Sequence, residues 1–205
     1  MNKKNFATIG VAIALTLLFI ATTQYPGGSQ HDDMSVGFSW QHNYLSNLLN
    51  PIAVNGQENA ARPWAVAGML FLCAAMALSF FQFSKKIPVK GAANSIVRYA
   101  GIGAMVAAVF TGTPFHDLAV RVSGTLLMVS LFYITVFILK SKLNGLKVLA
   151  AAGMLLLYGT SFIYYSSTYL EILPVMQKLL LITVVIWLLS LEYFTNRADF
   201  ELASS

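Results

Sequence analysis

The sequence predicts an all-α membrane protein. The predicted fold is a bundle of six transmembrane helices, with one further amphipathic helix on the outward-facing surface of the membrane. Two observations predict this class. The chain of 205 residues is 57% hydrophobic and only 10% charged, whereas soluble domains carry about 25% charged residues. The chain also contains six separate apolar runs, most of them long enough to cross a hydrocarbon core of about 30 Å as helices.

The six runs are joined by short polar connections, apart from one long connection after the first run. A backbone surrounded by lipid must satisfy its own hydrogen bonds, so each run is predicted to be a helix. No part of the chain resembles a soluble domain, and residues 1–205 are therefore interpreted as a single membrane domain. The runs cover residues 6–22, 64–83, 96–111, 118–139, 148–166 and 175–194.

The distribution of basic residues predicts the orientation. With the N-terminus inside, only Arg62, Arg121 and Lys178 lie on the outer side, and this bias follows the positive-inside rule. We therefore expect a multi-pass protein of the cell (inner) membrane with cytoplasmic N- and C-termini. The basic residues do not alternate with aromatic residues on one surface, so no nucleic-acid partner is expected. The inner basic residues are Lys3, Lys4, Lys85, Lys86, Lys90, Arg98, Lys140, Lys142, Lys147 and Arg197.

The long outer connection begins with a Pro-Gly-Gly turn at 26–28 and contains the predicted amphipathic helix at about 38–50. Pro51 marks the end of this helix. Its polar face has no Lys or Arg but offers hydrogen bonds in fixed directions. This face either lines an outer vestibule or simply contacts water. Its members recur at helical spacing and are Ser39, His42, Asn43, Ser46, Asn47 and Asn50.

A second group of polar residues lies at the outer ends of the fourth and sixth helices. Asp117 and Arg121 have the spacing of a helical ion pair, and Lys178 follows Glu171. One interpretation is two ion pairs that stabilise helix ends. The other is that Arg121 and Lys178 converge on an anionic headgroup, because Arg and Lys suit phosphate.

Catalytic chemistry is an alternative at the same surface. His42, His116 and Asp117 could hold a zinc ion with one open position, although no H-x-x-x-H or H-E-x-x-H spacing is present. On a helix, Ser46 would lie one turn from His42, which makes these two the candidate catalytic residues. No G-x-S-x-G motif surrounds Ser46.

Small residues form rows in two of the predicted spans. Ala100, Ala104 and Ala108 are spaced by four, and a second row covers 150–153. Such rows let helix backbones approach closely in lipid. We interpret them as packing within one bundle, with a homo-oligomer as the alternative.

Three short motifs carry a resemblance. They are the Pro-Gly-Gly turn at 26–28, the Trp-x-His-Asn-Tyr-Leu-Ser-Asn-Leu segment at 40–48 and the Thr-Pro-Phe-His-Asp segment at 113–117. Together they resemble a bacterial family of six-helix membrane proteins of unknown function near the DRAM/Sfk group. In this chain Asn47 takes the place of an acidic residue. The resemblance implies no known activity, but the wider group is linked to membrane lipid organisation and stress responses.

A second resemblance is to the alkaline-ceramidase superfamily of membrane hydrolases. It depends on Asn43-x-x-Ser46-Asn47 and on Phe115-His116. That superfamily has seven spans and a further pair of histidines in a late helix, and the last two helices of this chain contain no histidine.

The sequence therefore supports two functional hypotheses. The first is a non-enzymatic protein that binds a lipid or small amphiphile in an outward-facing vestibule, with His42, Asn43, Ser46, His116, Asp117, Arg121 and Lys178 as ligand-binding candidates. The second is an outward-facing, metal-dependent hydrolase acting on a lipid-like substrate. Transport is disfavoured because every charge lies near a helix end.

Overall fold

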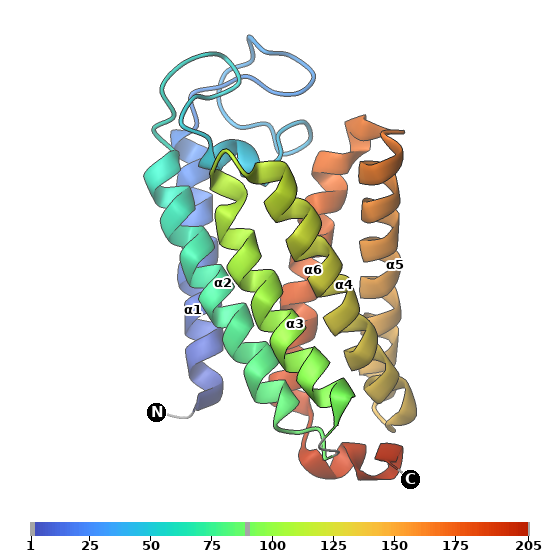
Figure 1. Cartoon of the computed structure of the whole chain (residues 1–205). Helices are drawn as coiled ribbons and strands as arrows, with labels where there is room; N and C mark the ends of the chain where they lie inside the picture. Colours follow the sequence, from blue (N-terminus) through green and yellow to red (C-terminus); the bar gives the residue numbers. More distant parts are fainter. Residues whose placement is uncertain (1–2, 89–90, 205) are drawn as a thin grey trace.

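The computed structural model describes residues 3–88 and 91–204 and shows a bundle of six long helices that run up and down in turn (Figure 1). All six predicted spans are confirmed, since each helix is long and apolar enough to cross a membrane. The helices are α1 (Lys3–Gln24), α2 (Arg62–Ser84), α3 (Ala92–Val109), α4 (His116–Lys140), α5 (Asn144–Ser166) and α6 (Leu173–Phe194).

The helices extend beyond most of the apolar runs because polar residues stabilise their ends. Helix α2 begins with Arg62 and has Pro63 in its first turn, where a missing N–H does no harm. Helix α4 carries Asp117 in its first turn and Lys140 in its last turn, which is the favourable arrangement of charges for the helix dipole. These residues are too polar to be counted in a hydropathy run, but they are good helix ends.

The bundle has two different ends (Figure 1). At one end, the connection between α1 and α2 forms a layer that we call the cap (residues 25–61). The other end carries both chain termini, and we call it the terminus end. Helix order places Arg62, Arg121 and Lys178 at the cap end. The other described basic residues lie at the terminus end, and Lys90 lies outside the described residues.

Neighbouring helices along the chain pack against one another, and α6 closes the bundle by packing against α2. Helix α1 packs outside this ring against α2 and α6. Large side chains such as Phe80, Ile134 and Trp187 are fully buried in the core. Because lipid gives no hydrophobic drive for helices to associate, close packing of such groups holds the bundle together.

The predicted small-residue packing is found inside the bundle. Gly101 of α3 packs against Phe80, and Gly153 of α5 packs against Trp187: a Cβ atom at these glycines would lie 2.3 Å and 2.9 Å from the respective rings. Ala104 and Ala150 are fully buried. Small residues therefore make room for the largest core side chains.

The predicted amphipathic helix over 38–50 is wrong in extent. Only Leu45–Leu49 is helical, as the short 3-10 helix η1, and Tyr44 before it has an extended backbone (ψ 149°). The reason is that Asn43 and Asn47 use their side chains to accept hydrogen bonds from backbone N–H groups. Asn side chains compete with helix formation in this way.

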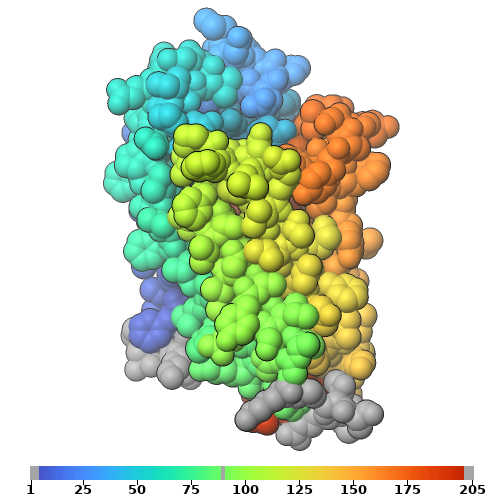
Figure 2. All heavy atoms as spheres, in the orientation of Figure 1, coloured from blue at the N-terminus to red at the C-terminus, as the bar shows by residue number. Residues whose placement is uncertain are grey.

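The cap is a packed structure. Tyr25, Leu48 and Leu49 form an apolar cluster with Ala21 of α1 and Ala65 of α2. The predicted Pro-Gly-Gly turn is wrong: residues 26–28 form no turn, and Gly27 pairs with Val36 in an isolated antiparallel β-bridge. Gly28 has a φ of +80° with the backbone of Asn55 so close that no side chain fits. Figure 2 shows the cap lying over the ends of α1 to α3, with the ends of α5 and α6 beside it.

Candidate functional site

Two asparagines of the outer segment, Asn43 and Asn47, are structural. Asn43 is fully buried; its Oδ1 accepts a hydrogen bond from Ser39 N, and its Nδ2 donates one to Gly28 O. Asn47 Oδ1 accepts a hydrogen bond from Tyr44 N. These side chains were predicted to face a vestibule or water, whereas they satisfy backbone groups within the cap.

Two residues that the sequence did not single out hold the same segment. Asn59 is buried, and its Nδ2 donates to the carbonyl oxygens of Asn47, Leu48 and Asn50. Gln177 of α6 accepts a hydrogen bond from Leu45 N at 2.9 Å. A lone Asn in a loop and a Gln in a span carry no sequence signal for these roles, because their partners are backbone atoms of distant residues.

After Asn43 and Asn47, Lys178 is the most deeply buried of the sequence-predicted site residues. Only 9% of it is exposed, and its Nζ donates to Asn43 O at 2.6 Å and to Pro174 O at 2.9 Å. The predicted ion pair with Glu171 is wrong: among the described residues no carboxylate pairs with Lys178. The carbonyl oxygens of Asn43 and Pro174 accept hydrogen bonds from the buried ammonium instead.

The start of α4 places His116, Asp117 and Arg121 at an exposed position of the cap end. His116 Nδ1 lies 3.1 Å from Asp117 Oδ1, and Arg121 Nε donates to the backbone oxygen of Asp117. The predicted Asp117–Arg121 ion pair is therefore absent from the described structure. Arg121 and Lys178 both donate to backbone carbonyls, and their convergence on a headgroup stays a prediction.

The predicted metal ligands are not brought together. No group of three His, Cys, Asp or Glu side chains that could share a metal ion exists within residues 3–88 and 91–204. His42 stacks on His31, with ring centroids 4.8 Å apart, while His116 pairs with Asp117. His42, His116 and Asp117 thus form no three-ligand site.

Ser46 and His42 also lack the expected relationship. Both are partly exposed, but the extended backbone at Tyr44 interrupts the helix that would have placed them one turn apart. No hydrogen bond joins Ser46 to His42 in the part of the chain that the structure describes. The geometry therefore provides no activated serine.

Burial raises the pKa of Tyr25 above its usual value of 10.0. Its hydroxyl oxygen accepts a hydrogen bond from Val54 N at 3.1 Å, and this contact opposes part of the shift. Burial also raises the pKa of Tyr44. Both phenols are therefore neutral parts of the cap at physiological pH.

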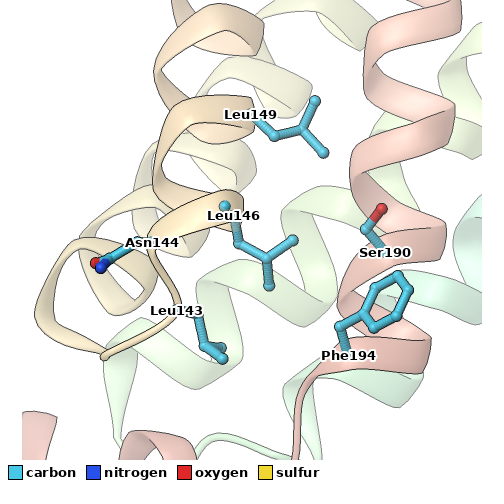
Figure 3. Close-up of a pocket in the computed structure, with 7 residues that line it drawn as sticks. Leu143, Asn144, Leu146, Leu149, Ser190 and Phe194 are labelled. Atoms are coloured by element: carbon cyan, nitrogen blue, oxygen red, sulfur yellow. The ribbon is translucent and has the colours of Figure 1, made fainter.

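The terminus end holds two apolar grooves that the sequence did not indicate. The first, of about 460 Å³, lies between the start of α5 and the end of α6 (Figure 3). Leu146 and Leu149 of α5 face Ser190 and Phe194 of α6 across it. None of the described residues that line this groove is charged.

The second groove, which we call the α1–α2 groove, has a volume of about 440 Å³. Its apolar part is formed by Phe6 of α1 and by Leu78 and Phe81 of α2. Gln82, Lys85 and Lys86 complete its lining. An apolar groove with lysines at one end matches the amphiphilic character of a membrane lipid.

The cations near this groove have different surroundings. Lys86 Nζ donates to the carbonyl oxygens of Leu191, Glu192 and Thr195 and so holds the end of α2 against α6. Lys85 is exposed, and its Nζ lies 4.0 Å from the centre of the Phe81 ring. The guanidinium carbon of Arg98, on α3, lies 4.5 Å from the same ring centre.

Comparison of the chain with models of protein families, with curated proteins and with solved structures finds no match.

Proposed function

We propose that this protein binds a membrane phospholipid or a similar amphiphile in the α1–α2 groove. In this proposal it is a non-enzymatic protein of the cell membrane, and its terminus end faces the cytoplasm. The excess of basic residues at that end supports the orientation.

The α1–α2 groove is the observation that carries the proposal. Its volume of about 440 Å³ falls within the usual range of ligand sites, about 300–1,000 Å³. Phe6, Leu78 and Phe81 offer an apolar surface for an acyl chain, and the lysines lie at the helix ends, where headgroups are found. Basic pockets between transmembrane helices on the cytoplasmic side are typical sites of anionic lipids.

The groove has better support than the outer vestibule expected from the sequence. Asn43, Asn47 and Lys178 make buried hydrogen bonds to backbone atoms. A ligand that used these groups would have to break contacts that hold the cap to the bundle. The cap is therefore better explained as a scaffold than as the lining of a site.

The hydrolase alternative lacks an observation that favours it. A hydrolytic zinc site needs about three protein ligands and an open position. The described side chains provide no such group, and no hydrogen bond among the described residues joins Ser46 to a base. Lipid binding without catalysis needs none of these features.

A variant that fills the groove tests the proposal. Leu78→Trp adds an indole to the groove, whereas Leu70→Trp makes the same change on the cap half of α2, at a side chain that is 49% exposed. A phosphatidylcholine with a photoreactive acyl chain should label Phe6, Leu78 or Phe81 in the wild type and in Leu70→Trp. Peptide mass spectrometry should find this labelling lost in Leu78→Trp. Equal labelling of both variants would overturn the proposal.

A further inference from the structure

Two cations beside the α1–α2 groove have no acidic partner among the described residues. Lys85 and Arg98 both lie within 4.5 Å of the centre of the Phe81 ring. Within the described part of the chain, neither makes an ion pair with a carboxylate. The face of an aromatic ring attracts a cation only weakly. The positive charges of Lys85 and Arg98 are therefore not neutralised by Phe81, and together they can bind an anion.

Arg98 provides an independent sign of a missing partner. Its Nε is buried and has no hydrogen-bond partner among the described residues. A buried N–H without a partner is rare and calls for an explanation. The guanidinium also lies 5.3 Å from the centre of the Tyr99 ring. The two aromatic rings beside it, Phe81 and Tyr99, offer no conventional hydrogen-bond acceptor for this N–H group.

The basic residues at this end are not interchangeable. Lys86 already donates to four oxygen atoms of α6 and its C-terminal cap and serves the fold. Lys85 is exposed at the end of α2, and Arg98 lies within the first half of α3. Among the described side chains around Phe81, these two are therefore the cations that remain for a ligand.

From this arrangement we infer that the α1–α2 groove selects an anionic phospholipid, whose phosphate binds Lys85 and Arg98 beside the Phe81 ring. The inference rests on the proposed function and adds the class of headgroup. Arg binds phosphate through two parallel N–H groups and Lys binds it as a point charge. Phe81 lines the groove and also contacts both cations, so acyl chain and phosphate meet at this residue.

The test compares phosphatidylglycerol with phosphatidylcholine on the full chain in uncharged detergent, counting bound lipids by native mass spectrometry. The wild type should prefer phosphatidylglycerol by about tenfold, as expected for charge-assisted hydrogen bonds. Lys85→Gln and Arg98→Gln should each reduce this preference. The double variant should abolish it, because it weakens phosphatidylglycerol more than phosphatidylcholine, whose choline already offsets the phosphate charge. Lys140→Gln is the control, because Lys140 is an exposed lysine at the same end.

Four results would overturn the inference: no preference in the wild type, a preference that survives in the double variant, an equal loss in Lys140→Gln, or displacement of phosphatidylglycerol by millimolar inorganic phosphate. The last result would identify a site for free phosphate. Lys85→Gln changes an exposed side chain, so it keeps the test valid if Arg98→Gln does not fold.

The groove-filling variant separates the two proposals. If Leu78→Trp loses both lipids while the charge variants have no effect, the groove binds lipid without selecting its headgroup, and only the inference fails. If Leu78→Trp retains both lipids, the proposed function fails as well.

Discussion

The ammonium group of Lys178 donates a hydrogen bond of 2.6 Å to the backbone oxygen of Asn43, which lies 135 positions earlier in the chain. This contact joins the last transmembrane helix to the cap. The neighbouring residue Gln177 makes a second connection through Leu45 N. The first turns of α6 thus hold the cap in place over the bundle.

Replacing Lys178 by methionine should destabilise the protein. The change leaves the carbonyl oxygens of Asn43 and Pro174 without their donor, so we expect the free energy of unfolding to fall by about 2–3 kcal/mol. Unfolding in mixed detergent micelles, followed by tryptophan fluorescence, measures this quantity. Lys140→Met is the control, because this lysine is exposed. Equal stability of the two variants would show that the buried bonds contribute nothing.

Two glycine substitutions should have opposite effects. In Gly101→Ala the new methyl group would lie 2.3 Å from the ring of Phe80, and overpacking of this kind lowers the free energy of unfolding by about 1–3 kcal/mol. Gly124→Ala places its methyl group in open space within α4, so helix propensity should raise stability by less than about 1 kcal/mol. Thermal unfolding of both variants checks the signs. A stable Gly101→Ala protein would contradict the close packing of α2 and α3.

Stability should fall at high pH because of Tyr25. Its pKa is raised in the folded state, so the folded protein holds the phenol proton more tightly than the unfolded chain does. The stabilisation is complete below pH of about 10 and is lost as the pH rises through the raised folded pKa. Unfolding measured between about pH 8 and 12 should show a steeper decline in the wild type than in Tyr25→Phe. Parallel curves would exclude Tyr25 as the cause.

Cysteine labelling should report the orientation. Met34 is 81% exposed in the cap, and Lys142 is exposed at the terminus end. On intact cells a membrane-impermeant maleimide should label Met34→Cys at once and Lys142→Cys only after permeabilisation. The single native cysteine, Cys73, is buried and should give little background. The reverse pattern would place the cap in the cytoplasm.

The six helices could be predicted from the sequence because the cause is local. A run of apolar residues must cross lipid as a helix whatever its neighbours are, and polar ends such as Asp117 and Lys140 only lengthen it. The rows of small residues that contain Ala104 and Ala150 likewise indicated packing, and the structure buries both alanines fully.

The cap could not be predicted in the same way. The spacing of Asn43, Ser46 and Asn47 fits one face of a helix, but Asn side chains also bind nearby backbone groups, and these contacts decided the local structure. The partners of Asn59 and Lys178 are carbonyl groups, which every residue has. Nothing in a sequence marks the carbonyl of Asn43 as the acceptor for a lysine in α6.

The α1–α2 groove escaped the sequence reasoning for a related reason. Phe6, Leu78 and Phe81 are ordinary apolar residues of two spans, and their common surface exists only after the helices have packed. Lys85 and Arg98 were counted as topology signals. Their shared contact with Phe81 depends on the register between α2 and α3.

The contacts inside the cap have a consequence for biogenesis. The apolar cluster around Tyr25 and the hydrogen bonds of Asn59 involve only residues 21–69. During synthesis the first helical hairpin can therefore fold its cap as soon as the second span has entered the bilayer, before the remaining spans leave the ribosome. The carbonyl of Asn43 then has no lysine donor until the sixth span has been inserted. The cap, which can fold first, therefore gains its last hydrogen bond from the last transmembrane helix.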